Sequence, residues 1–413
     1  MNTFYDIAIN LLGVGEKIGA YRSSKLKKLT EGQASALSYL EQKVERGSEY
    51  VWIHAASLGE FEQGRPLIEK IKREHPEIKV LLTFFSPSGY EVRKDYPLAD
   101  IVSYLPLDTP ENVVSFLKIV RPKMAIFVKY EFWGNYLQAL SRIGIPTYII
   151  SAIFRPTQIF FKPWGGLFRK MLQCFTHLYV QDKASLELLA SIGIKNVTVA
   201  GDTRFDRVTD IMRGCQAIAE ADAFVADGKL TIVAGSTWQP DEEFLLPYFN
   251  THPELKLIIA PHEVEPERIA GIEKMLKRKS CRLSTATPEE AATADCIIVD
   301  CFGKLSSLYT YGRIAYVGGG FGVGIHNINE AAVYGMPVVF GPKYQKFKEA
   351  IDLIAAEGAF SFDKREDFVN IMDKLTGNPG YLAKCGANAA AYIKANLGAT
   401  TKIYNDLFGS VGK

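Results

Sequence analysis

Short apolar runs alternate with amphipathic stretches along almost the whole chain after Tyr50. The first series of predicted strands covers residues 51–53, 79–83, 101–105, 124–128, 147–151, 178–181 and 197–200. A second series covers residues 230–234, 255–260, 296–300, 314–317 and 337–340, and helical patterns separate the members of both series. Alternation of this kind is typical of parallel sheets with helices on both faces. The pattern therefore predicts two doubly wound α/β domains.

The length of the chain agrees with this division, because 413 residues are too many for one ordinary hydrophobic core. We expect residues 1–206 to form a first Rossmann-like domain that includes an N-terminal helix, and residues 229–395 to form a second. The intervening residues 207–228 are alanine-rich and polar without a strand pattern, which favours a linker. Residues 396–413 are helical in pattern, with a break at Gly398, and could cross back to the first domain.

Two segments of the first domain combine apolar and basic side chains. In the N-terminal helix an apolar stripe is followed by a basic cluster, and the residues are Phe4, Ile7, Leu11, Val14, Ile18, then Lys17, Arg22, Lys25, Lys27 and Lys28. Residues 155–175 mix aromatic side chains with lysine and arginine. Both patterns suit the surface of an anionic membrane. Each also suits a helix that packs on its own domain with a solvated basic end, and the sequence leaves both interpretations open.

Charge and cysteine content exclude some classes of protein. A formal net charge of +2 gives no general case for binding nucleic acid. The six cysteines are scattered without a C-x-x-C pair, which argues against a zinc site or a disulfide framework and fits a reducing cytosol. There is no apolar run of the roughly 18 residues that a membrane span needs. Nor does the start of the chain have the pattern of a signal peptide.

The stretch VWIHAASLGE, residues 51–60, places a carboxylate directly after a predicted strand. Ala55, Ala56, Ser57 and Gly59 form a strand-to-helix turn, where open α/β sheets bind ligands. Ser57 and Glu60 have the spacing of a helix capping box, in which each side chain bonds the other's backbone amide. Glu60 could equally be a general base, because a positioned carboxylate can take a proton from an attacking hydroxyl. On spacing alone the cap is favoured.

In the second half, a strand runs into a glycine-rich stretch at residues 318–342. Its glycines allow a ligand to approach the backbone, and the helix predicted at 328–334 could hold a phosphate at its N-terminus. The glycines are out of register for a dinucleotide fingerprint. Glu330 either accepts hydrogen bonds from a ribose or only complements the helix dipole. His262, after a neighbouring strand, either donates to a phosphate or caps a turn.

Five motifs, taken together and in this order, resemble the Kdo transferases, the 3-deoxy-D-manno-octulosonic acid transferases of lipopolysaccharide synthesis. They are HAASLGE at 54–60, YEFWGN at 130–135, GDTRFD at 201–206, GSTWQPDEE at 235–243 and VGGGFGVGIHNINEAAVYGMPVVFGP at 317–342. The resemblance covers nearly the whole chain. It implies an α/β GT-B fold, two Rossmann-like doubly wound domains that face each other across a cleft, with a lipid A precursor on the first and CMP-Kdo on the second.

The resemblance also implies roles for individual residues. Glu60 matches the glutamate that is assigned as the general base of the family. The implied acceptor-binding residues are Ser57, Gly59, Glu131 and Trp133, and the implied donor-binding residues are Arg204, Ser236, Thr237, His262, Gly319, Gly320, Asn327 and Glu330. The chain departs from the family pattern in three places. The acidic residue that often precedes Glu131 is absent, Arg204 replaces a lysine, and the arginine expected before His262 is Pro261.

The implied reaction is an inverting transfer of Kdo from CMP-Kdo to the lipid A precursor lipid IVA, without a metal or other cofactor. The chain contains no Asp-x-Asp pair, which agrees with a metal-independent mechanism. We expect an enzyme that associates with the cytoplasmic face of the inner membrane as a peripheral or monotopic protein. Two alternatives remain: another GT-B enzyme that uses a UDP-sugar, either a glycosyltransferase or an epimerase, and a noncatalytic module that binds nucleotides or lipopolysaccharide.

Overall fold

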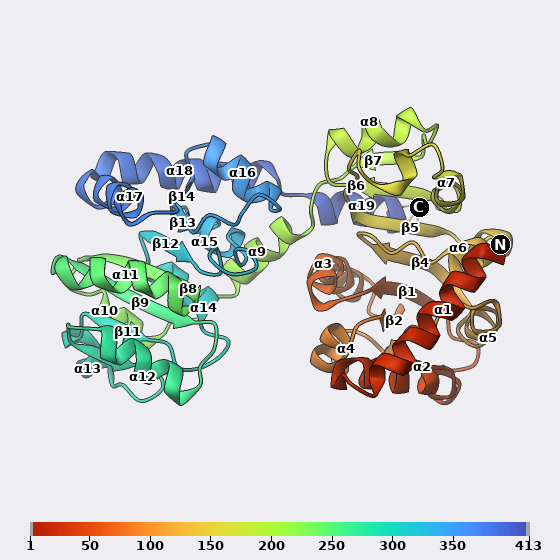
Figure 1. Cartoon of the computed structure of the whole chain (residues 1–413), viewed down its shortest axis with the longest axis horizontal. Coiled ribbons are helices and arrows are strands. Elements are labelled where there is room, and N and C mark those ends of the chain that lie inside the picture. Colours follow the sequence, from red (N-terminus) through yellow and green to blue (C-terminus); the bar gives the residue numbers. More distant parts are fainter. Residues whose placement is uncertain (1–2, 410–413) are drawn as a thin grey trace. The chain divides into compact units, whose positions relative to one another are not determined.

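The computed structural model describes residues 3–409, which form two units, each an α/β sandwich around one sheet (Figure 1). Unit 1 contains residues 3–207 and 397–409, and unit 2 contains residues 208–396. The division between the units falls inside helix α9 (Arg204–Arg213). The expectation of two doubly wound α/β domains is confirmed, since each unit holds a parallel sheet with helices on both faces.

Unit 1 is built on a sheet whose strands all run parallel, in the order β3-β2-β1-β4-β5-β6-β7. The strands are β1 (Tyr50–Ala55), β2 (Lys79–Phe84), β3 (Ile101–Tyr104), β4 (Pro122–Val128), β5 (Thr147–Ala152), β6 (His177–Val180) and β7 (Val197–Val199). The order reverses between β1 and β4. In open α/β sheets, ligands bind outside the carboxyl ends of the strands at this reversal.

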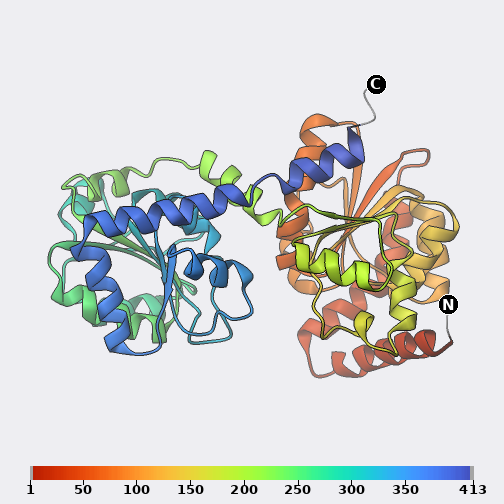
Figure 2. The ribbon, with the colours of Figure 1, turned by 90° about the horizontal axis from the view of Figure 1, so that it is seen from above.

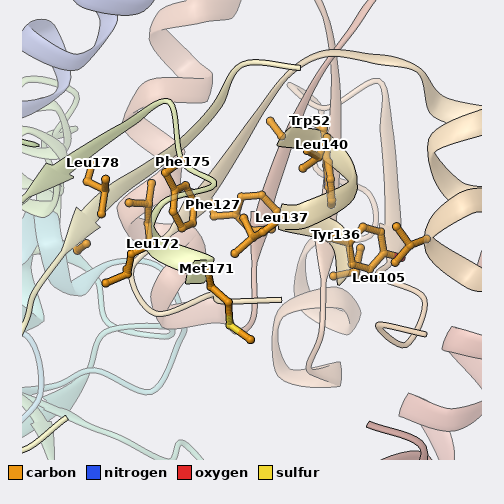
Figure 3. Packing of buried hydrophobic residues seen from close by; sticks show 14 of the residues in the cluster. Trp52, Leu105, Phe127, Tyr136, Leu137, Leu140, Met171, Leu172, Phe175 and Leu178 are labelled. Atoms are coloured by element: carbon orange, nitrogen blue, oxygen red, sulfur yellow. The ribbon is translucent and has the colours of Figure 1, made fainter. Parts of the chain in front are cut away.

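Helices cover both faces of this sheet because successive strand residues point to opposite sides. Trp52 of β1 packs with Phe127 and Tyr136 on one face, and Figure 3 shows this cluster. Val51 and Ile53 point to the other face. The helices of unit 1 are α1 (Thr3–Ala20), α2 (Ser24–Lys43), α3 (Leu58–Glu74), α4 (Pro87–Arg93), α5 (Pro110–Val120), α6 (Gly134–Arg142), η1 (Ile159–Phe161), α7 (Gly166–Leu172), α8 (Lys183–Ser191) and α19 (Ala399–Phe408).

Unit 2 has a second parallel sheet, in the order β10-β11-β9-β8-β12-β13-β14. Its strands are β8 (Leu230–Thr237), β9 (Leu255–Pro261), β10 (Ser280–Arg282), β11 (Cys296–Ile298), β12 (Ile314–Val317), β13 (Val338–Phe340) and β14 (Ala359–Ser361). Its helices are α10 (Ala219–Phe224), α11 (Gln239–Thr251), α12 (Pro266–Met275), α13 (Pro288–Thr293), α14 (Leu305–Leu308), η2 (Tyr309–Tyr311), α15 (Asn329–Ala332), α16 (Lys348–Ala355), α17 (Arg365–Gly377) and α18 (Pro379–Ala395). The strand order reverses between β8 and β12.

Three local features differ from the sequence expectations. The pattern did not predict β10 and β14, which are edge strands of three residues and too short for a period of two to show. The helix expected at 328–334 is the four-residue α15, because the chain turns at Gly335 with a positive φ of 72°. Part of the expected linker, α10, packs against α13 within unit 2 and buries Phe224 completely.

The last described helix, α19, belongs to unit 1 and packs on α3. Its apolar side chains Ile403, Tyr404 and Phe408 join the cluster formed by one face of the sheet. The carboxylate of Asp206 accepts hydrogen bonds from the backbone N–H groups of Gly398 and Thr400, both at 2.7 Å. Gly398 is the N-cap residue of α19 and has no side chain that could accept these hydrogen bonds. The side chain of Asp206, in α9, therefore caps the N-terminus of α19.

The two apolar-basic segments have different surroundings. On α1 the five residues of the predicted stripe are between 51% and 79% exposed, while Ile9 and Gly13 face unit 1. Figure 2 shows α1, in red, at the outer surface of this unit. In 155–175 most of the aromatic and aliphatic side chains pack on the core, and only Trp164, at 73%, is strongly exposed. Within residues 3–409, no helix combines the length and hydropathy required to cross a membrane.

We expect Ile403→Ala to lower the free energy of unfolding of unit 1 by about 2–5 kcal/mol, because Ile403 is fully buried between α19 and the sheet. Hydrogen exchange of the α3 amides should become faster, since α19 covers α3. The control is Val114→Ala, a substitution of a side chain that is 66% exposed on α5. Unchanged protection of α3 in Ile403→Ala would contradict the prediction.

Candidate active site

The polar residues predicted from the sequence gather at the carboxyl ends of the strands next to each reversal of strand order. In unit 1, Glu60 follows β1 and Glu131 follows β4, and β1 and β4 are neighbours in the sheet. In unit 2, Ser236 ends β8 and Gly319 follows β12, which are also neighbours. Each unit therefore presents its candidate residues at the position where doubly wound sheets bind ligands.

Glu60 lies in the first turn of α3 and bonds backwards to the turn that leads into the helix. Its Oε2 accepts a hydrogen bond of 2.7 Å from the N–H of Ala56. The hydroxyl of Ser57, the N-cap residue, makes no capping hydrogen bond. The reciprocal capping box is therefore not formed, and only the glutamate stabilises the turn. This geometry fixes the carboxyl group at the end of β1.

Two effects make Glu60 a weak acid for a glutamate. Burial raises its pKa to about 7, and the negative charge of Glu131 adds to the rise. The N–H of Ala56, the cation of Lys129 and the N–H of Ser57 act in the opposite direction. A carboxyl group that titrates near neutral pH can accept a proton efficiently and release it again, which is the requirement for a general base.

Glu131 is buried and is held by two aromatic side chains. Its Oε2 lies 2.6 Å from the indole Nε1 of Trp133 and 3.0 Å from Nε2 of His54. The ring of His54 is completely buried, and its Nδ1 lies 2.9 Å from the hydroxyl of Thr83. Sequence reasoning assigned Glu131 and Trp133 to one site, and the structure brings them into direct contact.

Three residues other than glycine have left-handed backbone conformations at or next to the carboxyl ends of strands. They are Lys129 after β4, with φ 67°, Ser151 in β5 and Ser236 in β8, both with φ 52°. Such conformations cost of the order of 1–3 kcal/mol each and persist where the surrounding structure imposes them. Their position at the two predicted ligand-binding edges supports a functional origin for the strain.

Arg204 lies in unit 1 at the start of α9, where the buried carboxylate of Asp202 holds its guanidinium. Oδ2 of Asp202 accepts hydrogen bonds from Nε at 2.9 Å and from the terminal Nη2 at 2.7 Å. Burial acts to raise the pKa of Asp202, but the charge and hydrogen bonds of Arg204 outweigh it and hold this pKa below its usual value. Gln63 also bonds this carboxylate. The cation is therefore pre-oriented, with its side chain about a quarter exposed (28%).

The glycine-rich turn of unit 2 is tied to α11 by a buried aspartate that the sequence analysis did not single out. Oδ2 of Asp241 accepts hydrogen bonds from the N–H of Gly319 at 3.0 Å and of Trp238 at 2.9 Å, while Oδ1 accepts from the Tyr316 hydroxyl at 2.9 Å. Gly319 has a φ of 93°. A Cβ atom on the preceding Gly318 would lie 2.2 Å from the carbonyl oxygen of Ser236. The turn can therefore form only with glycine here.

Three rings stack beside this turn: Trp238, His262 and His326. The ring centroids are 4.7 Å apart for Trp238 and His262 and 4.5 Å apart for His262 and His326. The indole N–H of Trp238 donates to Nε2 of His326 at 3.2 Å, which leaves the proton of the neutral imidazole on Nδ1. Burial and the neighbouring His262 lower the pKa of His326, so the ring is neutral at pH 7.

The other residues predicted to bind the sugar donor lie near these three rings in the sequence, and each makes different hydrogen bonds. Thr237 is buried and donates its hydroxyl to Glu242 at 2.8 Å, so the hydroxyl already has an acceptor. The amide of Asn327 donates to Glu330 at 3.0 Å. The N–H of Lys343 donates to the backbone carbonyl of Gly320 at 2.9 Å.

Asn329, which was not predicted, is fully buried, and neither atom of its amide has a hydrogen-bond partner within the described residues. Because buried amides are nearly always bonded, both atoms of this amide are available to a polar partner outside the protein.

Sequence reasoning missed five residues of the two sites: His54, Asp241, Trp238, His326 and Asn329. His54 was assigned to a motif but given no role, because its neighbours in the strand are apolar. Asp241 and Trp238 lie within GSTWQPDEE, and His326 and Asn329 lie within the glycine-rich motif. The side-chain partners of His54 and His326 are tens of residues away in the chain, so spacing gives no signal. Across residues 3–409, no group of three His, Cys, Asp or Glu side chains has the arrangement of a metal site.

Comparison with known proteins assigns the family. A family model described as 3-deoxy-D-manno-octulosonic-acid transferase (kdotransferase) matches residues 14–207. The 3-deoxy-D-manno-octulosonic acid transferase of Aquifex aeolicus is 31% identical over 333 residues, which are 79% of this chain and 85% of the relative. The chain belongs to the Kdo transferase family. A second member, from Rickettsia bellii, is 26% identical over 360 residues and 84% of each chain.

Members of the Kdo transferase family are glycosyltransferases, and this chain is one. A crystal structure of a UDP-N-acetylglucosamine 2-epimerase matches 88% of this Kdo transferase chain and 97% of its own, with a TM-score of 0.59 and 12% sequence identity. Identity this low shows the fold alone, which is GT-B. The family and the fold implied by the five motifs are thus confirmed.

We expect Glu131→Gln to lower the pKa of Glu60 from about 7 by roughly one unit, because the substitution removes the like charge that favours protonation. The titration can be followed by NMR with ¹³C-carboxyl-labelled glutamate, and the resonance of Glu60 is the one missing in Glu60→Gln. Glu62→Gln is the matched control, since Glu62 lies on the same helix but pairs with Arg93. An unchanged titration midpoint in Glu131→Gln would contradict the prediction.

Proposed function

We propose that this Kdo transferase moves Kdo from CMP-Kdo to the lipid A precursor lipid IVA in lipopolysaccharide synthesis, by a single inverting displacement that needs no metal. Unit 1 binds the acceptor and unit 2 binds the donor. The observation that carries the proposal is Glu60, a half-buried carboxyl group with a pKa of about 7 at the reversal of strand order in unit 1. Membership of the Kdo transferase family is the reason for proposing Kdo as the transferred sugar.

In the proposed reaction Glu60 takes the proton from a sugar hydroxyl of the acceptor. The resulting oxygen nucleophile attacks the anomeric carbon of Kdo from the face opposite the leaving group, and the bond from this carbon to the phosphate oxygen of CMP breaks. CMP leaves with the bonding electrons, and the configuration at the anomeric carbon inverts. The pKa of Glu60 fits this role because about half of the group is ionised at pH 7 and the carboxylate is basic enough to accept the proton.

Unit 2 offers groups suited to a nucleotide donor. The backbone of the turn at Gly319 allows close approach of a phosphate, and Asp241 keeps this backbone in place. The neutral His326 has its Nδ1–H left to donate, and the amide of Asn329 has no partner in the described chain. Arg204 belongs to unit 1 and is a further cation whose chemistry suits the donor carboxylate or phosphate. Because the chain lacks an Asp-x-Asp pair, we propose that these groups replace a divalent metal.

We also propose that α1 seats the protein on the inner-membrane surface, at the cytoplasmic face. The exposed apolar stripe can enter the interface of the bilayer. The five basic residues that follow it are exposed too and can contact anionic headgroups. The 155–175 segment contributes only through Trp164, since its other aromatic residues are part of the core.

The proposed reaction predicts CMP release from CMP-Kdo that depends on the acceptor and not on added metal. Glu60→Gln should lower this rate by about 10²–10⁴-fold, the usual contribution of a general base. Binding of the donor and thermal unfolding should stay close to those of the parent. Glu62→Gln, the control on the same helix, should keep full activity.

Three results would reject parts of the proposal. Full activity of Glu60→Gln would show that the carboxylate only stabilises the turn. Inhibition by UDP and not by CMP would favour the alternative of a GT-B enzyme that uses a UDP-sugar. Donor binding without any turnover in the parent would favour a noncatalytic module.

Replacement of Phe4, Ile7 and Leu11 by serine should reduce binding to vesicles of anionic phospholipid, measured by co-sedimentation. The stripe is exposed, so the free energy of unfolding should change little. The matched control replaces Val92, Val114 and Ile143, which are similarly exposed elsewhere on unit 1. Equal losses in the two triple variants would reject α1 as the membrane contact.

A further inference from the structure

His54 has no role in the reaction proposed above, although it lies at the end of β1 beside the residues that do. Its ring is completely buried, and both nitrogens have partners. Nδ1 lies 2.9 Å from the Thr83 hydroxyl and 3.1 Å from the Thr83 carbonyl oxygen. Thr83 thus offers both a donor and an acceptor, and Nδ1 is satisfied whether or not it carries a proton. The Thr83 hydroxyl is itself fixed by a 2.8 Å hydrogen bond from the indole of Trp52.

The other nitrogen of His54 determines the environment of Glu131. Nε2 lies 3.0 Å from Oε2 of Glu131, so an N–H at this position donates to the carboxylate. The indole N–H of Trp133 lies 2.6 Å from the same oxygen and 3.1 Å from Nε2, and the shorter distance identifies the carboxylate as its acceptor. One oxygen of Glu131 therefore receives two N–H donors from rings that are themselves packed edge to face.

We propose that His54 is a positioning residue for Kdo transfer, which holds the carboxylate of Glu131 in a fixed orientation so that its charge acts on Glu60. The inference rests on the proposed role of Glu60. It assigns a chain of contacts from Trp52 through Thr83 and His54 to Glu131. All of these contacts lie within unit 1, along neighbouring strands β2, β1 and β4.

The groups around Glu60 agree with this arrangement. Among charged side chains, Glu131 raises the pKa of Glu60 and Lys129 lowers it. Burial raises the pKa of Tyr130, and the nearby charge of Glu60 adds to the rise. Without a donor from His54, the carboxylate of Glu131 keeps only one of its two N–H donors and can turn away from its present position. Glu60 would then lose part of the neighbouring charge that opposes its ionisation.

Two substitutions of His54 separate its two contacts. In His54→Gln the side-chain amide reaches the position of Nε2 and keeps a donor to Glu131. In His54→Asn the amide reaches only the position of Nδ1, so the contact with Thr83 remains and the donor to Glu131 is lost. We expect His54→Asn to lower the titration midpoint of Glu60 by roughly one pH unit, towards its value in Glu131→Gln. His54→Gln should titrate like the parent.

The rate of CMP release provides a second measurement. We expect it to fall roughly tenfold in His54→Asn and to be largely kept in His54→Gln. In the Glu131→Gln background, His54→Asn should cause no further change in the midpoint of Glu60, because the route through Glu131 is already removed. A purely structural role would lower the temperature of unfolding in both variants and leave the midpoint of Glu60 where it is in the parent.

An equal shift in the two His54 variants, or one that persists in the Glu131→Gln background, would overturn the proposal. If His54→Asn does not fold, Thr83→Val replaces it, with a smaller shift expected in the same direction and no shift as the contrary result. The NMR titration needs no turnover. It decides the role of His54 even if Glu60→Gln retains activity and the proposed general base is wrong.

Discussion

In each unit, all strands of the sheet run in the same direction, and the chemistry of the protein depends on this constraint. Every connection that follows a strand begins at the edge of the sheet where the carboxyl ends lie. Residues that are far apart in the chain therefore come close together at this edge. His54 and Glu131 are 77 residues apart in the sequence, but Nε2 of His54 lies 3.0 Å from Oε2 of Glu131. The same rule brings Ser236, Trp238 and Gly319 together in unit 2. The sheets themselves are ordinary, and their buried strands need only apolar side chains.

At the carboxyl ends of the strands, burial gives a polar group a different pKa from the one it has in water. A carboxyl group on a free helix end is an ordinary acid, but Glu60 is partly removed from solvent and lies near a second carboxylate. The hydrogen bond from Ala56 lowers the pKa of Glu60 by less than burial raises it. The left-handed backbones of Lys129 and Ser151 lie at the same edge, on neighbouring strands. Strain, burial and like charge thus occur together at this edge of the sheet.

Much of the fold and some of the site could be predicted from the sequence, for reasons visible in single elements. Strands such as β12 (Ile314–Val317) match the expectation because a buried parallel strand is a continuous apolar run. Glu60 was found because a carboxylate directly after such a run is a local signal. The contact between His54 and Glu131 is not local, and no periodicity encodes it. The α1 stripe and the 155–175 segment have similar compositions, yet one is exposed and the other packs on the core, because tertiary contacts decide which apolar face is covered.

The return of α19 to unit 1 makes this unit discontinuous in the sequence. Unit 2 is a single uninterrupted stretch, whereas unit 1 is completed by residues that follow unit 2 in the chain. A nascent or truncated chain that ends within unit 2 therefore leaves the α3 side of the first sheet without its cover, and exposes the apolar positions against which Ile403 and Phe408 pack. Folding of the unit that carries Glu60 therefore requires residues from both sides of unit 2 in the sequence.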